Sequence, residues 1–302
     1  MKKNKVSILL FHRVHPVRDV MWDPIDPARF EFILRFLKKN YTVLPLLEIL
    51  DTTPSYTKKP LAAVTFDDGY RDFIDYSVPI MDQLKIPSSM YVVTDCISND
   101  KPTWTFEMDY LFFNTHKLQI DWSFNIGCLP ARFRKNKFAN KKELIAFCLE
   151  FKQYIKIIAD ENRKILIQDL FRSFNDVTVP RGLMMNWNEV NQIINAGIEV
   201  GSHTVTHPPL ATISKPDLER ELQLSKSEYF KYTGKDPRVI AYPVGSCNEQ
   251  VKKSATLAGY NYGLAVNNEI YDKGSGDKFE IPRIELYNES FGRTWLRIKQ
   301  FG

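Results

Sequence analysis

Short apolar segments rich in β-branched and aromatic residues alternate along this chain with segments whose apolar residues recur at helical spacing. This alternation is typical of βα units arranged around a mainly parallel sheet. The strands that the pattern predicts are Val6–Phe11, Tyr41–Leu44, Leu61–Phe66, Ser89–Val93, Ile198–Gly201, Val239–Ala241 and Tyr262–Val266.

Three helices of this pattern carry start or stop signals. The first begins at Asp26-Pro27, an N-cap followed by a residue suited to the first helical position. Another runs from Trp187 to Gly197, and a third begins near Ser214 and ends at Gly234. In the first helix the apolar residues recur at helical spacing, at Phe30, Ile33, Leu34 and Leu37.

The stretch 98–181 interrupts this rhythm, because it is long, rich in aromatic residues and predicts several consecutive helices (Glu107–Phe113, Lys141–Ile158 and Glu161–Phe174). We interpret it as a helical insertion into one domain that spans residues 1–302. The sequence does not determine an oligomeric state.

Charge and hydropathy exclude several classes of protein. The net charge is +5 over 302 residues, without a block of like charges, so a nucleic-acid partner is not expected. No apolar stretch reaches the length of about 18 residues that a spanning helix needs. The basic start is followed by only six apolar residues before His12 and Arg13, too few for a signal peptide, which favours a cytoplasmic protein. The four cysteines form no Cys-x-x-Cys pair and are expected to be free thiols.

Candidate chemistry gathers where two predicted strands end. Asp67 and Asp68 follow Leu61–Phe66, and His203 and His207 follow Ile198–Gly201. Strand ends of parallel sheets are where active sites collect, and two histidines with one carboxylate can hold a divalent metal with open positions. Each element also has a plainer explanation, since Asp-Asp-Gly is a good turn and a His-x-x-x-His pair is often incidental.

A third element is the segment from Arg238 to Tyr242-Pro243-Val-Gly245. A cation such as Arg238 beside a carboxylate would lower its pKa and fix its orientation. The alternative is a surface arginine that precedes a buried strand.

Together, Thr65-Phe-Asp-Asp-Gly-Tyr70, Ser202-His-Thr-Val-Thr-His207 and Arg238-Val-Ile-Ala-Tyr-Pro-Val-Gly245 resemble the first three motifs of the NodB-homology polysaccharide deacetylases, carbohydrate esterase family 4. The resemblance implies an α/β fold, a distorted (β/α)7 barrel similar to a TIM barrel. It also implies a metal-dependent hydrolase of carbohydrate metabolism that removes acetyl groups from N-acetylated sugars.

The same resemblance assigns roles to these residues. Asp68, His203 and His207 would hold the metal, and Asp67 would be the general base. Arg238 would orient Asp67, and the backbone amide of Tyr242 would help to stabilise the oxyanion. Histidine and carboxylate ligands suit zinc, with cobalt and nickel as alternatives.

The sequence departs from the family pattern in one place. A Leu-x-His motif, whose histidine protonates the leaving amine, usually lies near the C-terminus, yet no histidine follows His207. Leu10-Phe11-His12 has that form at the end of the first strand, as in a circularly permuted branch of the family. We therefore predict that His12 is the general acid; the alternative is a core or turn histidine.

Some residues stay open at this level. Arg283, in Ile281-Pro-Arg-Ile-Glu285, occupies the place of the family's fourth motif and could supply an ion pair. Trp104, Asp109 and Trp187 could form a sugar platform or simply pack.

Two other functions remain as alternatives. One is a catalytically silent carbohydrate-binding protein on the same barrel, and the other is a metallohydrolase of a non-sugar amide or ester. Serine catalysis and nucleotide binding are disfavoured because neither Gly-x-Ser-x-Gly nor a phosphate-binding glycine motif occurs. The expected partner is an N-acetylated saccharide or glycoconjugate whose identity the sequence does not define.

Overall fold

The strand β3 (Leu61–Asp68) lies inside the sheet, and all eight of its residues are buried. It pairs in parallel with β1 (Lys5–Phe11) on one side and with β4 (Ser89–Val92) on the other. Strands of a parallel sheet that are covered on both faces have nearly continuous apolar sequences, which explains why Leu61–Phe66 is recognisable. The computed structural model describes residues 4–19, 21–52, 58–122 and 129–299.

Within these residues the main sheet runs in the order β10-β1-β3-β4-β7-β8-β9, with β11 added to β1 and β2 added to β3. The strands not yet introduced are β2 (Thr42–Val43), β5 (Gln119–Asp121), β6 (Lys135–Lys137), β7 (Glu199–Ser202), β8 (Val239–Ala241), β9 (Tyr262–Leu264), β10 (Tyr271–Asp272) and β11 (Ile284–Glu285).

The helices of the described residues are α1 (Pro27–Asn40), α2 (Leu46–Asp51), α3 (Val78–Leu84), α4 (Thr94–Asn99), α5 (Trp104–Asn114), α6 (Ala131–Arg134), α7 (Lys141–Ile155), α8 (Asp160–Ser173), α9 (Trp187–Asn195), α10 (Lys215–Thr233), α11 (Glu249–Leu257) and α12 (Phe291–Lys299). Single turns of other helix types lie at Phe73–Ser77, Leu210–Thr212 and Pro243–Gly245.

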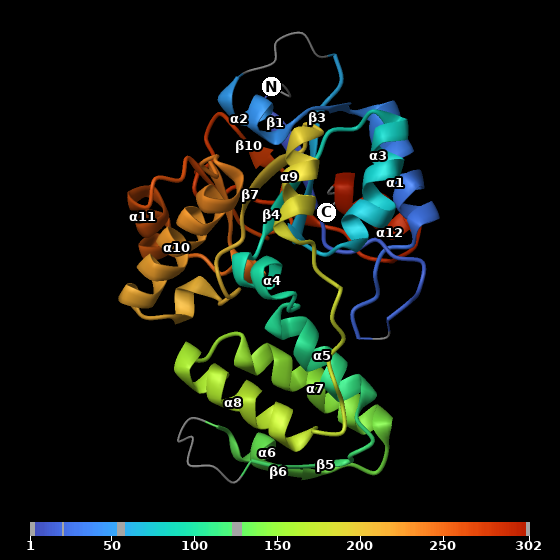
Figure 1. Ribbon diagram of the computed structural model, residues 1–302. Coiled ribbons are helices and arrows are strands. Elements are labelled where there is room, and N and C mark those ends of the chain that lie inside the picture. Colours follow the sequence, from blue (N-terminus) through green and yellow to red (C-terminus); the bar gives the residue numbers. More distant parts are fainter. Residues whose placement is uncertain (1–3, 20, 53–57, 123–128, 300–302) are drawn as a thin grey trace.

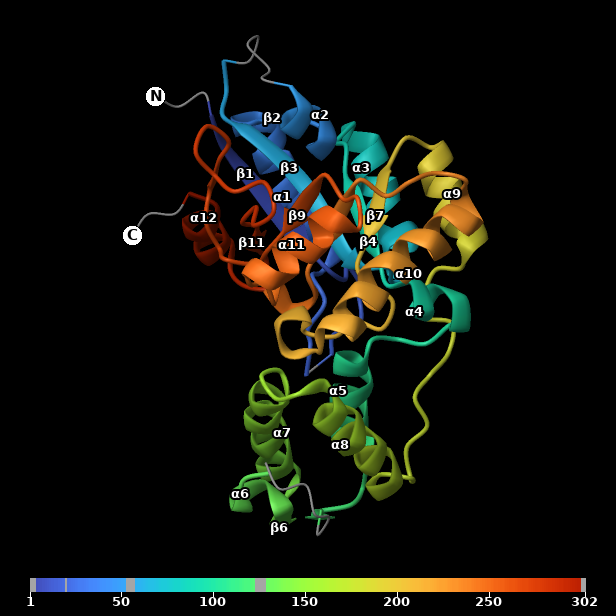
Figure 2. The same ribbon diagram turned by 90° about the vertical axis from the view of Figure 1, so that its left-hand side faces the viewer.

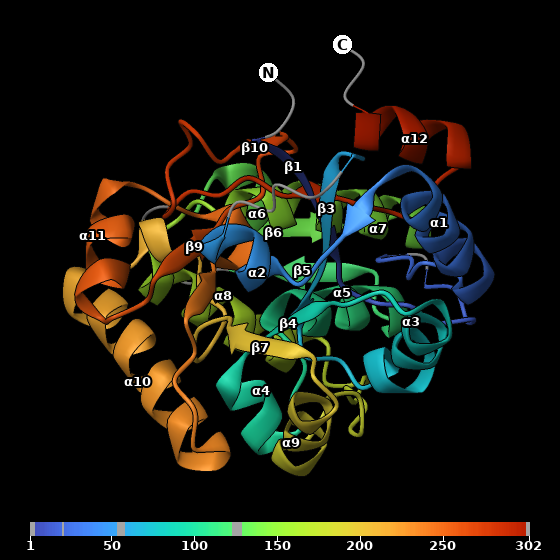
Figure 3. The same ribbon diagram turned by 90° about the horizontal axis from the view of Figure 1, so that it is seen from above.

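The sheet closes on itself through the segment between Ile281 and Glu285. Leu264 of β9 forms a parallel bridge with Ile281, and β11 pairs in parallel with β1. Seen from above, the strands are surrounded by helices α1, α3, α9, α10 and α11 (Figure 3). The predicted (β/α) barrel is therefore confirmed as the fold class.

The seven predicted strands are all present, with ends shifted by at most two residues. The first helix is also confirmed: Asp26 caps α1 through its side chain, and its buried residues are those named from the pattern. Likewise Ser214 caps α10, and Gly234 ends it with a positive φ of 68°. The strands β10 and β11, of two residues each, were not predicted.

Residues of the stretch 98–181 form a lobe below the barrel, in which α5, α7 and α8 lie together (Figures 1 and 2). The lobe has its own apolar cluster, which includes Trp122, Phe133 and Phe151. Its helices α5, α7 and α8 were predicted, whereas the short helix α6 and the antiparallel pair of β5 and β6 were not. The division into one domain with an insertion stays a prediction.

Two expectations concern the chain as a whole. Cys96, Cys148 and Cys247 are free thiols, as expected, and Cys128 lies outside the described residues. Among the helices of the described part, none is both long enough and apolar enough to cross a bilayer.

Candidate active site

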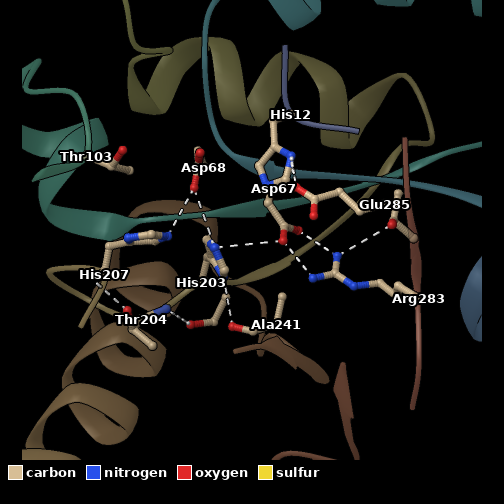
Figure 4. Close-up of polar contacts among 12 residues, drawn as sticks. His12, Asp67, Asp68, Thr103, His203, Thr204, His207, Ala241, Arg283 and Glu285 are labelled. Atoms are coloured by element: carbon tan, nitrogen blue, oxygen red, sulfur yellow. Dashed lines mark hydrogen bonds and ion pairs between the residues drawn. The ribbon is translucent and has the colours of Figure 1, made fainter. Parts of the chain in front are cut away.

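Two acids and two histidines lie together where β3 and β7 end (Figure 4). Asp67 and Asp68 are the last residues of β3, and His203 directly follows β7. The intervening strand β4 sets their spacing, because its residue Val92 is in register with both Asp68 and Ser202. The backbone N–H of His203 also donates to the Val92 carbonyl at 2.8 Å. The sheet register therefore places the Asp-Asp and His motifs at one end of the barrel.

Asp68, His203 and His207 form a group that fits a metal ion. Their candidate ligand atoms lie within 4.8 Å of one another, and all three residues are buried. The Oδ1 of Asp68 is 3.5 Å from the Nε2 of His203 and 3.4 Å from the Nε2 of His207. Among the described residues this oxygen has no hydrogen-bond partner, so a cation would satisfy it. One carboxylate and two imidazoles suit zinc and related divalent ions.

The pKa values of His207 and Asp68 favour metal binding. The Nδ1 of His203 donates to the carbonyl of Ala241 at 2.8 Å, which turns its Nε2 toward Asp68. Burial would lower the pKa of His203, but the carboxylates of Asp67 and Asp68 raise it above its usual value. Burial lowers the pKa of His207 to about 3, so that its imidazole is neutral. Burial would raise the pKa of Asp68, but the neighbouring histidines hold it well below its usual range. Metal ligands must be in these deprotonated forms.

The loop that carries His207 is held from two sides. Glu221 of α10 accepts the backbone N–H groups of Val205 and Thr206 at 2.8 and 3.0 Å and the hydroxyl of Thr206 at 2.7 Å. The indole Nε1 of Trp104, from α5, donates to the carbonyl of His207 at 2.8 Å. The insertion therefore helps to position a candidate metal ligand.

The backbone at this site is strained. Asp68, Thr204 and His207 have φ values of 77°, 70° and 60°, in the left-handed region that side chains other than glycine rarely adopt. Each such residue costs of order 1–3 kcal/mol and persists where the surroundings enforce it, which is common at functional sites.

Asp67 lies beside the candidate metal ligands, with its Oδ2 3.8 Å from the Nε2 of His203, and is held there by an arginine. Arg283 donates to its two carboxylate oxygens at 2.7 and 2.6 Å, and both residues are buried. Burial would raise the pKa of Asp67, but the guanidinium of Arg283 and then His203 hold it below the usual value. Asp67 is thus an ionised carboxylate next to, but distinct from, the carboxylate of Asp68.

The structure corrects the prediction for Arg238. This residue precedes β8, at the end of the sheet opposite the site, and it donates to both oxygens of Asp51 at 2.8 Å. Its side chain is 42% exposed. The alternative interpretation, a surface arginine before a buried strand, is therefore right, and Arg283 holds the position beside Asp67 that was assigned to Arg238.

The prediction for the amide of Tyr242 is also wrong. Its backbone N–H donates to the carbonyl of Leu264 at 2.9 Å and so belongs to the sheet, while its hydroxyl donates to the carbonyl of Phe279. The residue of this segment that lines the site is Val244, which has a φ of 51°.

His12 lies at the end of β1, next to β3, as the strand pairing from Val6–Leu61 to Phe11–Phe66 requires. It lines a cavity of about 170 Å³ together with Asp67, Asp68, His203 and His207. Its Nδ1 is 3.7 Å from the Oε1 of Glu285, on β11. The structure thus brings His12 to the candidate site, whereas its role as an acid and the circular permutation stay predictions.

Trp104, Asp109 and Trp187 do not form one platform. Trp104 lies in the wall beside His207, whereas Asp109 is buried in the insertion in an ion pair with Lys152. Trp187 packs on α10, stacked on Tyr232 with ring centroids 4.6 Å apart.

Sequence reasoning missed Glu221 and the residues of the insertion that line the cavity, Thr105, Lys152 and Lys156. No local pattern distinguishes these residues from ordinary helix residues. The sequence analysis named Glu285 only as the last residue of the segment around Arg283 and assigned it no role.

Comparisons with known proteins agree with this arrangement. Residues 159–263 match the family model described as polysaccharide deacetylase. This match includes both histidines but not Asp67 and Asp68, which the fold brings to them. The peptidoglycan-N-acetylglucosamine deacetylase of Bacillus cereus is 34% identical over 71 residues, 24% of this chain and 33% of that protein. YxkH of Bacillus subtilis is 29% identical over 76 residues, 25% of this chain and 27% of that protein. These matches thus span a third or less of the relatives' lengths.

Solved structures resemble the fold of nearly the whole chain. The Streptococcus pyogenes deacetylase PplD, in complex with acetate, has a TM-score of 0.63 at 18% identity, with 97% of each chain covered. A de-N-acetylase from Aggregatibacter actinomycetemcomitans has a TM-score of 0.61 at 17% identity, with 97% of this chain and 99% of that chain covered.

Proposed function

We propose that this chain, which belongs to the polysaccharide deacetylase family, is a metal-dependent hydrolase that removes acetyl groups from an N-acetylated sugar. One observation carries the proposal. Asp68, His203 and His207 converge on one point, while a second carboxylate, Asp67, is held beside them by Arg283 and remains free for proton transfer. This division of two adjacent acids into a ligand and a base is what amide hydrolysis at a metal requires.

A divalent metal held by Asp68, His203 and His207 would polarise the acetamide carbonyl and acidify water, and we propose zinc. Asp67 accepts the proton of the attacking water, because its pair with Arg283 keeps it ionised and fixes its orientation. We place the oxyanion near Val244, the residue of the segment after β8 that lines the cavity.

His12 donates a proton to the leaving nitrogen, which an amide needs because an amine anion is a poor leaving group. Glu285, 3.7 Å from its Nδ1, orients the imidazole so that Nε2 faces the substrate. Lys152 and Lys156 of the insertion border the same cavity and limit the shape of the sugar that enters.

The test is the release of acetate from a panel of N-acetylated saccharides, with zinc, cobalt or nickel added. Acetate release that Asp67→Asn abolishes while the bound metal remains supports the proposal. Sugar binding without acetate release would indicate a silent carbohydrate-binding protein, and release only from peptides or aryl acetates would indicate a non-sugar hydrolase. The cytoplasmic location also stays a prediction, to be tested by cell fractionation.

A further inference from the structure

A second cavity, of about 380 Å³, lies between the barrel and the insertion. We call it the Glu107 pocket. It is larger than the cavity of about 170 Å³ that contains Asp68, His203 and His207, which we call the metal cavity. The volume of the Glu107 pocket falls in the range that is usual for ligand sites. Its lining residues come from α4, the loop that follows α4, α5, α8 and the loop around His207, and they include Trp104, Glu107, Arg163, Gln168 and Phe171.

Glu107 is the feature that points to a ligand. Its residue is 6% exposed, and among the described residues its carboxylate has no hydrogen bond or ion pair. Burial raises its pKa to about 7, although Lys101 and Arg181 oppose this rise from a distance. Glu107 lines the pocket, so a ligand that donates hydrogen bonds to its carboxylate would be stabilised there.

The other polar groups of the Glu107 pocket already have partners or lie at its rim. Asp160 pairs with Arg163 and with Lys164, and Asp95 accepts a hydrogen bond from Asn99. Lys101 and Gln168 are exposed. Across the lining, three acids (Asp95, Glu107 and Asp160) balance three bases (Lys101, Arg163 and Lys164), which favours an uncharged ligand.

Apolar groups form the rest of the walls. Trp104 and Phe171 contribute aromatic rings, and one face of Trp104 is covered by the guanidinium of Arg163 at 5.5 Å. A pyranose ring combines apolar C–H faces with hydroxyl donors at its edge, so it matches both the rings and the free carboxylate.

The Glu107 pocket and the metal cavity are lined by neighbouring residues of the same two segments. Thr105 and His207 line the metal cavity, whereas their neighbours Trp104, Thr206 and Pro208 line the Glu107 pocket. A saccharide chain that crosses these two segments would occupy both cavities.

We propose that the Glu107 pocket binds a neutral sugar ring of the same saccharide whose N-acetyl group enters the metal cavity. The proposal rests on the proposed function and adds to it a second sugar-binding site, formed between the barrel and the stretch 98–181. Glu107 accepts hydroxyl hydrogen bonds, while Trp104 and Phe171 contact the face of the ring.

The test compares N-acetylglucosamine with its hexasaccharide as substrates of the zinc-loaded protein. Glu107→Gln should lower kcat/KM for the hexasaccharide by about tenfold, the loss expected for a hydrogen bond to a charged group, and leave the monosaccharide unchanged. The matched control is Glu161→Gln, which changes an exposed acid in the first turn of α8 and should alter neither value. Equal loss on both substrates, or no loss on either, would overturn the proposal.

A binding measurement separates this proposal from the proposed function. The hexasaccharide is titrated calorimetrically into zinc-loaded Asp67→Asn, with and without Glu107→Gln. Binding weakened about tenfold by Glu107→Gln supports the pocket even if no sugar is ever deacetylated, whereas no binding or equal binding refutes it. Gln168→Ala, at the exposed rim, serves as a second variant if Glu107→Gln does not fold, and it should weaken hexasaccharide binding severalfold.

Discussion

The assignment of Arg283, rather than Arg238, as the residue that orients Asp67 can be tested by substituting each arginine. Arg283 is fully buried and donates to both oxygens of the buried Asp67. Arg283→Gln would leave that carboxylate buried without its partner, which costs roughly 3–5 kcal/mol. Arg238→Gln breaks a half-exposed pair with Asp51, and such pairs contribute about 0.2–1 kcal/mol.

The measurement is urea unfolding of both variants beside steady-state kinetics. Arg283→Gln should lower the free energy of unfolding by about 3 kcal/mol or more and kcat/KM by roughly 10²–10⁴-fold, the range for loss of a general base. Arg238→Gln should resemble the unmodified protein in both measurements.

Arg283→Lys distinguishes charge from geometry. It keeps the positive charge but loses the fork that matches two carboxylate oxygens, so its stability should lie between those of Arg283→Gln and the unmodified protein, while kcat falls. If Arg238→Gln were the more damaging change, or if Arg283→Gln were fully active, the assignment of Arg283 as the residue that positions Asp67 would be refuted.

Three further predictions address the metal, the acid and the buried carboxylate. His203→Ala should lose the divalent ion, whereas Asp67→Asn should keep about one per chain, as measured by elemental analysis; unchanged metal in His203→Ala contradicts the ligand assignment. His12→Ala should strongly reduce amide hydrolysis, retain metal and spare an activated aryl acetate, whose leaving group needs no proton; equal loss on both substrates excludes the acid role. Because burial raises the pKa of Glu107 from 4.5 to about 7, the native state binds this proton more tightly than the unfolded chain, and stability falls as pH rises between these values. Glu107→Gln should remove that fall. Its free energy of unfolding, relative to that of the unmodified protein, should therefore be about 3 kcal/mol higher at pH 8 than at pH 4.5. Parallel plots of the free energy of unfolding against pH for the two proteins would show that the carboxylate is not isolated.

The pattern of residues along the chain determined the elements of the barrel and the acids and histidines at its strand ends. The strand at Leu61–Phe66 can be predicted because a strand buried on both faces is apolar throughout. Helix α1 can be predicted because its cap and its helical period are local features of the sequence. Asp68, His203 and His207 could also be identified as candidates from the sequence, because they follow predicted strands. The helices α5, α7 and α8 of the stretch 98–181 were also predicted from their local pattern.

Only the tertiary structure decided which charged groups meet. Arg283 and Asp67 are 216 positions apart, and Arg238 and Asp51 are 187 apart, so no local period relates either pair. Both arginines stand next to short strands, and the choice between them depends on which end of the sheet each one occupies. The tertiary structure also decided the role of the backbone amide of Tyr242, which donates a hydrogen bond to Leu264 of β9 and so is not available to an oxyanion. The Glu107 pocket exists only because the insertion folds back against the His207 loop, a contact between segments that carry no shared signal in the sequence.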